Sequence, residues 1–223
     1  MMPGNMALGA INSTKDAMLA GEITGQELKA LGINVNLAPV ADVNINPDNP
    51  VIGVRSFGSD PARVGQLAVA YIKGLDSAGV AAAAKHFPGH GDTAVDSHLA
   101  LPMLPHDLNR LQQVELKPFQ MAIDQGVDMI LSAHVTFPAI DNTKAKSLKD
   151  GKEISVPATL SARVMTDLLR DRMGFEGVII TDALKGMNAI NDNFGTEEAV
   201  VRAIRAGSDI ILMPADLDKA YNA

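Results

Sequence analysis

The chain has 223 residues, of which 47% are apolar, and it carries a formal net charge of −7. This length allows one large domain or two small ones, and the acidic balance argues against a surface that binds nucleic acid. The sequence contains no cysteine, which excludes a disulfide framework and thiol chemistry. No apolar stretch reaches the roughly 18 residues that a membrane-spanning helix needs.

The N-terminal region is predicted to fold as a helix followed by a short strand. Thr24 and Glu27 have the spacing of a capping box, and Gly32 can end a helix, so this helix is expected to stop near Leu31. Apolar residues then alternate with asparagine over residues 33–37, a pattern typical of a strand.

A long connection and a second helix come next. Residues 41–59 are rich in turn-forming residues, and a loop of this length without its own elements is more often functional than idle. Asp60 and Pro61 are the residue types of a helix N-cap and a first-turn proline. The small apolar residues over 80–84 then predict a buried strand.

The second half of the chain continues the alternation of helix and strand. The predicted helices cover residues 107–124 with a break near Val114, 161–172 with Ser161 as its cap, and 196–206 opened by Thr196. The predicted strands cover residues 127–133, 178–180 and 209–213. Five strands separated by helices argue for a parallel sheet with crossover helices.

Polar side chains gather where the predicted strands end, namely Asp42, Lys85, His86, His134 and Asp182. In β/α-barrels this end of the sheet carries the active site, and a doubly wound sheet, the alternative fold, also places its ligands there. The sequence has no Gly-x-Gly-x-x-Gly turn and no P-loop that would support a nucleotide.

The stretch over residues 85–98 concentrates the residue types that carry chemistry. Asp96 and His98 are two residues apart, so a carboxylate can fix the imidazole tautomer and make a proton shuttle that works near neutral pH. A solvated loop with scattered histidines is one alternative interpretation. The other is a metal site, with ligands drawn from His86, His90, Asp92 and His98.

The string KHFPGHGDTAVDSH over residues 85–98 resembles the signature of the family 3 glycoside hydrolases, in the β-N-acetylglucosaminidase (β-N-acetylhexosaminidase) branch. Other segments fit the same pattern along nearly the whole chain: PGNMALGA, NVNLAPVADVN, NPDNPVIGVRSFG, VPATLS, GFEGVIITDAL and AGSDIILMP. The resemblance implies an α/β fold of the TIM-type (β/α)8 barrel. Residues 1–223 are then a single catalytic barrel domain, expected to be incomplete with about five parallel strands.

The resemblance further implies that the chain is an internal piece of that barrel. The family's acidic Asp-x-Glu-Gly-Gly-Arg turn, expected ahead of PGNMALGA, has no counterpart here, although a naturally short variant is the alternative. Five strands cannot close a barrel, so we expect self-association through the open sheet edges.

The resemblance also implies roles for individual residues. Asp182 is expected to be the nucleophile, and His98 the general acid and base, oriented by Asp96. The expected hydrogen-bonding partners of the sugar are Arg55, Lys85 and His86.

Other readings remain open for some of these positions. From the residues alone, Asp182 can also be a helix N-cap, and the run at residues 185–187 looks one residue longer than the family pattern. Asp42 and His134 are expected to support the site or to play a plain structural role.

The expected function is that of a retaining exo-β-N-acetylglucosaminidase. Its partner would be a glycan containing N-acetylglucosamine, from peptidoglycan fragments or chitin oligosaccharides, and neither a cofactor nor a metal is expected. An inactive or sugar-binding fragment and a metal-dependent hydrolase are the two alternatives. The 144–157 connection resembles that of envelope-associated members of the family, which favours the cell envelope or the extracellular space, with the cytoplasm as the alternative.

Overall fold

The structure is a computed structural model that describes residues 3–223. Its centre is a sheet of four parallel strands in the order β1 (Val35–Asn36), β2 (Ala81–Phe87), β3 (Met129–Ser132) and β6 (Val178–Ile180). The order across the sheet follows the order along the chain, as in a β/α-barrel, whereas a doubly wound sheet reverses direction at a switch point. The fold is therefore an incomplete TIM-type barrel.

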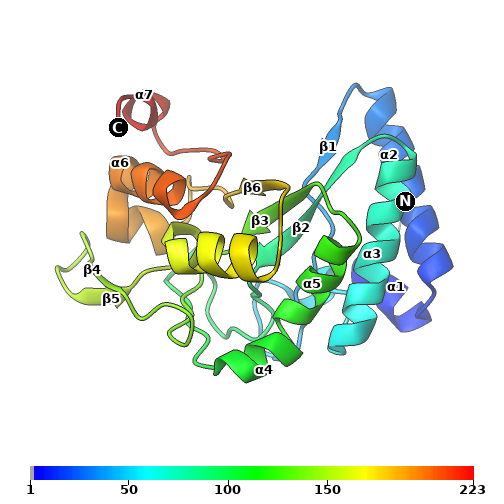
Figure 1. Cartoon of the computed structure of the whole chain (residues 1–223), viewed down its shortest axis with the longest axis horizontal. Coiled ribbons are helices and arrows are strands. Elements are labelled where there is room, and N and C mark those ends of the chain that lie inside the picture. The colour runs from blue at the N-terminus through cyan, green and yellow to red at the C-terminus, as the bar shows by residue number, and fades with distance from the viewer. Residues whose placement is uncertain (1–2) are drawn as a thin grey trace.

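Helices connect the consecutive strands and lie outside the sheet (Figure 1). The helices are α1 (Asn5–Ile11), α2 (Thr14–Ala30), α3 (Pro61–Ser77), α4 (Leu108–Gln113), α5 (Leu116–Asp124), the π-helical segment Arg163–Arg172, α6 (Asn188–Ala206) and α7 (Leu217–Asn222). In Figure 1, α2 and α3 lie beside the β1 end of the sheet and α6 lies beyond β6. No helix in the described part of the chain is long and apolar enough to cross a membrane.

Strand β2 is central in the sheet and is built from small side chains. Ala82, Ala83 and Ala84 are completely buried, because neighbouring strands flank β2 and side chains cover both of its faces. The next two residues, Lys85 and His86, then emerge at the carboxyl end of the strand. A run of small residues thus delivers two polar side chains to the edge where a barrel carries its chemistry.

Helices α2 and α3 pack at unusually close range through glycine. A Cβ added to Gly21 would lie 2.2 Å from the carbonyl oxygen of Tyr71, and one added to Gly74 would lie 2.1 Å from that of Met18. Any side chain at either position would force the backbones apart. This contact anchors α3 against α2. The start of α3 is capped by Asp60, as predicted, because the Asp60 carboxylate accepts a hydrogen bond from the amide of Arg63 at 2.7 Å.

Several predicted helix boundaries are confirmed, and two predicted starts differ from the structure. The break near Val114 separates α4 from α5, and Ser161 Oγ accepts the amide hydrogen bond of Val164 at 3.2 Å. The capping-box prediction at Thr24 is wrong, because α2 already begins at Thr14 under the cap of Ser13. The Thr24 hydroxyl instead donates to the carbonyl oxygen of Ala20 inside the helix.

The last predicted helix begins earlier than expected. Helix α6 starts at Asn188, not at Thr196, but Gly195 interrupts it with a φ of 68° and a non-helical ψ. This interruption falls directly before Thr196, so the sequence signal marks a real restart of the helix. The connection over residues 138–157 contains the antiparallel hairpin β4 (Lys144–Lys146) and β5 (Glu153–Ser155).

The sheet has four regular strands, not five. Over residues 209–213 only a parallel bridge forms, between Ile180 and Ile210. The ladder stops because the amide of Leu212 donates to the side-chain Oγ1 of Thr181 at 2.9 Å, where a continuing strand would use a backbone carbonyl. Met213 then turns away with a φ of 47°.

Both margins of the sheet carry exposed apolar side chains. Ile33 and Val35 are exposed along β1, and Ile210 is exposed beyond β6. Open strand margins favour pairing with further strands or another chain. Self-association through these margins stays a prediction.

Candidate active site

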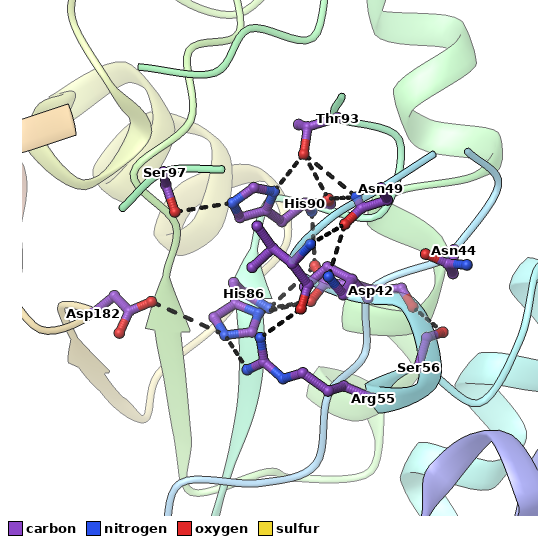
Figure 2. A network of polar contacts seen from close by, with 12 residues as sticks. Asp42, Asn44, Asn49, Arg55, Ser56, His86, His90, Thr93, Ser97 and Asp182 are labelled. Carbon is purple, nitrogen blue, oxygen red and sulfur yellow. Dashed lines mark hydrogen bonds and ion pairs between the residues drawn. The ribbon is translucent and has the colours of Figure 1, made fainter. Parts of the chain in front are cut away.

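The carboxyl ends of the strands bring distant polar residues together, as the barrel topology requires (Figure 2). His86 lies at the end of β2, and Asp182 follows β6 by two residues. The imidazole Nε2 of His86 and the carboxylate Oδ2 of Asp182 are 4.0 Å apart. Two residues separated by almost a hundred positions therefore share one site.

Asp42 is the buried anchor of this site. Its carboxylate lies 2.7 Å from His86 Nδ1, and it accepts hydrogen bonds from the backbone amides of His86, at 3.2 Å, and His90, at 2.7 Å. Burial alone would raise the pKa of Asp42, but the attraction of His86 and these hydrogen bonds outweigh it and lower the pKa below its ordinary value. An ionised Asp42 accepts, so His86 donates from Nδ1.

Arg55 completes the orientation of the His86 ring. Its Nη2 lies 3.3 Å from His86 Nε2, and a guanidinium can only donate. The His86 ring is therefore held between the carboxylate of Asp42 at Nδ1 and the guanidinium of Arg55 beside Nε2. Arg55 is itself fixed by a hydrogen bond from Nη1 to the carbonyl oxygen of Val51 at 3.1 Å.

Lys85 is the second cation predicted for the site, and it is partly buried at the end of β2. Burial and repulsion from Arg55 lower its pKa, while the carboxylates of Asp182 and Asp42 act in the opposite direction. Lys85 is thus electrostatically coupled to Asp182 and Arg55, and His86 lies 4.0 Å from Asp182. Charged donors of this kind form strong hydrogen bonds to hydroxyl and carbonyl groups.

The position of Asp182 is set by its own backbone and by His134. Asp182 Oδ1 accepts a hydrogen bond from the amide of Ala183 at 2.7 Å, and the side chain is 29% exposed. His134 Nε2 lies 3.1 Å from the carbonyl oxygen of Ala183 and must donate to it. Burial lowers the pKa of His134, which favours the neutral ring, and its Nδ1 lies 2.9 Å from the Thr159 hydroxyl.

The structure brings Asp96 and His98 into direct contact. Asp96 Oδ1 lies 2.8 Å from His98 Nδ1 and accepts the His98 backbone amide at 2.8 Å. Partial burial would raise the pKa of Asp96, but the hydrogen bonds from His98 outweigh it and lower the pKa. The pair fixes His98 as a donor at Nδ1, which leaves Nε2 for proton exchange; the side chain is 57% exposed.

The Asp96–His98 pair lies at the entrance of α6, the helix that follows Asp182. The amide of Asn188 donates to the carbonyl oxygen of His98 at 3.4 Å, and that of Ala189 donates to the carbonyl oxygen of Ser97 at 3.2 Å. The segment that carries the pair is therefore tied to the same strand-to-helix connection that holds Asp182.

The residues of the metal alternative do not come together as a ligand set. Within residues 3–223, the grouping that brings three such side chains within 4.8 Å is Asp92, His106 and Glu115. In that group Arg110 already pairs with Glu115 at 2.6 Å and with Asp92 at 3.4 Å. The Arg110 guanidinium therefore already supplies a positive charge beside these two carboxylates. That the protein binds no metal stays a prediction.

Sequence reasoning missed one residue that organises this region. Asn49 Nδ2 donates to the carbonyl oxygen of His90 at 2.8 Å, and its Oδ1 accepts the amides of Val51 and Ile52. It joins the 41–59 connection to the 85–98 loop. The turn-rich composition of that connection signalled a functional loop but did not single out this asparagine.

We expect the Asp42→Asn substitution to destabilise the fold by about 1–3 kcal/mol at neutral pH, because it puts an amide NH2 group in place of a carboxylate oxygen that accepts buried hydrogen bonds. The pKa of Asp42 is lowered in the folded state, so its stabilising contribution is present above the ordinary aspartate pKa and is lost as the pH falls through the folded value. Denaturant melts of both proteins at several pH values should show a difference that shrinks in acid. A constant difference at all pH values would contradict an ionised Asp42.

Comparisons of the chain with protein-family models, related sequences and solved structures give one consistent result. The model of the glycosyl hydrolase family 3 N-terminal domain matches residues 1–223. Beta-hexosaminidase A from Pseudoalteromonas piscicida is 46% identical over 95% of this chain, which spans 36% of that relative. The chain thus covers about a third of the length of this curated relative.

Solved structures give the same relationship. A family 3 β-N-acetylglucosaminidase from Paenibacillus sp. str. FPU-7 superimposes with a TM-score of 0.91 at 48% identity, covering 99% of this chain and 40% of that protein. Zinc-bound CbsA from Thermotoga neapolitana superimposes with a TM-score of 0.87 at 35% identity, covering 98% of this chain and 45% of that protein. The chain therefore belongs to glycoside hydrolase family 3, and it matches the N-terminal domain of that family.

Proposed function

We propose that this chain carries the catalytic centre of a retaining exo-β-N-acetylglucosaminidase. The observation that carries the proposal is the 2.8 Å contact between Asp96 and His98, on a loop tied to the connection that follows Asp182. A paired imidazole and a separate, partly exposed carboxylate are the two groups that double displacement at a sugar requires. The names of the related enzymes support N-acetylglucosaminyl glycans as the substrate class.

In the first step, a carboxylate oxygen of Asp182 attacks the anomeric carbon and the bond to the leaving oxygen breaks. His98 gives its Nε2 proton to that oxygen, and Asp96 stabilises the imidazolium that supplied it. The products are a glycosyl ester on Asp182 and the free alcohol.

In the second step, a water molecule attacks the same carbon and the ester bond to Asp182 breaks. Neutral His98 takes the water proton at Nε2, which restores the starting state. Two displacements on one carbon give net retention of configuration. Arg55, Lys85 and His86 are the proposed hydrogen-bonding partners of the sugar, because Lys85 and His86 lie at the end of β2 beside Asp182 and Arg55 contacts His86 from the 41–59 connection.

The test is an assay of the complete gene product on a chromogenic β-N-acetylglucosaminide, with and without a chelator. We expect hydrolysis that is insensitive to chelation and much faster than that of the matching glucoside. Loss of activity on chelation with recovery on added zinc would replace this mechanism by the metal-dependent one. Running the 223-residue chain beside the complete product tests the alternative of an inactive or sugar-binding fragment.

A further inference from the structure

Ser97 differs from the two residues beside it, although all three belong to one loop. Ser97 is 2% exposed, whereas the flanking His98 side chain is 57% exposed. The Ser97 hydroxyl Oγ lies 3.2 Å from the imidazole Nε2 of His90. The residue between the members of the dyad is therefore the one that points into the protein.

His90 is itself held rigidly on three sides (Figure 2). Its ring is buried, with Nδ1 2.7 Å from Thr93 Oγ1. Its backbone amide donates to Asp42 at 2.7 Å, and its carbonyl oxygen accepts from Asn49 at 2.8 Å. The carboxylate that orients His86 thus also fixes the backbone of His90.

Counting protons assigns a direction to the His90–Ser97 hydrogen bond. The Thr93 hydroxyl lies 3.1 Å from the His90 carbonyl oxygen and donates its one proton there. Thr93 Oγ1 then accepts from His90 Nδ1–H. Burial lowers the pKa of His90 to about 4, so the ring is neutral and its Nε2 accepts from the Ser97 hydroxyl.

We propose that His90 and Ser97 are positioning residues for the acid/base step: their hydrogen bond latches the Asp96–His98 segment to the Asp42 anchor. The inference rests on the proposed function of His98. Apart from this latch, the hydrogen bond that the described residues make with Ser97 joins its carbonyl oxygen to the amide of Ala189. Releasing the latch should move His98 Nε2 relative to the leaving oxygen, and a shift of about 1 Å can cost roughly 10²-fold in rate.

The latch acts on proton transfer and leaves Asp182 untouched, so its loss should depend on the leaving group. We expect Ser97→Ala, in the complete gene product, to lower kcat/KM about 10- to 100-fold for an alkyl N-acetylglucosaminide that needs protonation. For an activated nitrophenyl substrate, whose leaving group departs without a proton, the loss should stay below about threefold.

Ser208→Ala is the matched control. Ser208 is also a buried serine, but its Oγ has no hydrogen-bond partner among the described residues, so its removal should leave both substrates unaffected. His90→Gln keeps an acceptor near the Nε2 position and should retain more alkyl-glycoside activity than His90→Leu, which has none. Thermal melts of every variant establish that the protein is folded.

These variants distinguish failure of the proposed latch from failure of the proposed acid role of His98. If Ser97→Ala slows both substrates equally, or neither, while His98→Ala remains selective for the alkyl substrate, the latch is wrong and the role of His98 stands. If His98→Ala itself shows no dependence on the leaving group, the proposed acid function fails and this inference falls with it.

Discussion

Replacing Asp182 by alanine is expected to lower kcat by about 10⁴-fold or more, the scale of loss seen when a catalytic nucleophile is removed. The carboxylate at the end of β6 lies 4.0 Å from His86 and has no nearby substitute in the proposed mechanism. Without it, no glycosyl ester can form, and the reaction must proceed by direct displacement.

A small external nucleophile provides the discriminating measurement for this variant. The space left by the Asp182 carboxylate can admit azide, which should restore part of the turnover and release a glycosyl azide. Asp209→Ala is a suitable control, since that carboxylate follows α6, where it pairs with Arg170 and accepts the amide hydrogen bond of Ile179. Near-normal hydrolysis by Asp182→Ala would reassign Asp182 to a structural cap, the alternative that the sequence left open.

Replacing His98 by alanine is expected to produce a loss that depends on the leaving group. General acid catalysis contributes about 10²- to 10⁴-fold, so substrates with poor leaving groups should lose activity in that range. Activated phenolic substrates should be affected much less in the first step, because their leaving group needs no proton. The measurement is kcat/KM across a series of aryl glycosides with leaving groups of increasing pKa.

The informative quantity is how steeply kcat/KM falls as the pKa of the leaving group rises. This dependence should be shallow in the parent protein and steep in His98→Ala, with Asp96→Ala changed in the same direction because Asp96 holds the His98 tautomer. A dependence of unchanged steepness in both variants would show that another group donates the proton.

Local sequence patterns predicted the parts of the fold that depend on neighbouring residues. The buried alanine run of β2, the Asp60 cap of α3 and the break at Val114 are all present. These features depend on helix capping, side-chain size and apolar periodicity, which act over a few residues. The convergence of His86 with Asp182 followed from the parallel order of the strands.

The features that were missed depend on partners far away in the chain. The fifth strand fails because Thr181 offers a side-chain oxygen to Leu212 in place of a continuing ladder. The importance of Asn49 arises from a contact with the carbonyl of His90, 41 residues later. A single sequence carries no record of such contacts, whereas the family resemblance supplied the expected site residues directly.

The location of a covalent intermediate tests the central claim most directly. The complete gene product would be incubated with a fluorinated N-acetylglucosaminyl donor that slows the second displacement, then digested and analysed by mass spectrometry. We predict a glycosyl adduct on the peptide that contains Asp182, at that residue, and its absence in Asp182→Ala. An adduct on a different carboxylate, or hydrolysis that inverts the anomeric configuration with no adduct at all, would contradict the account.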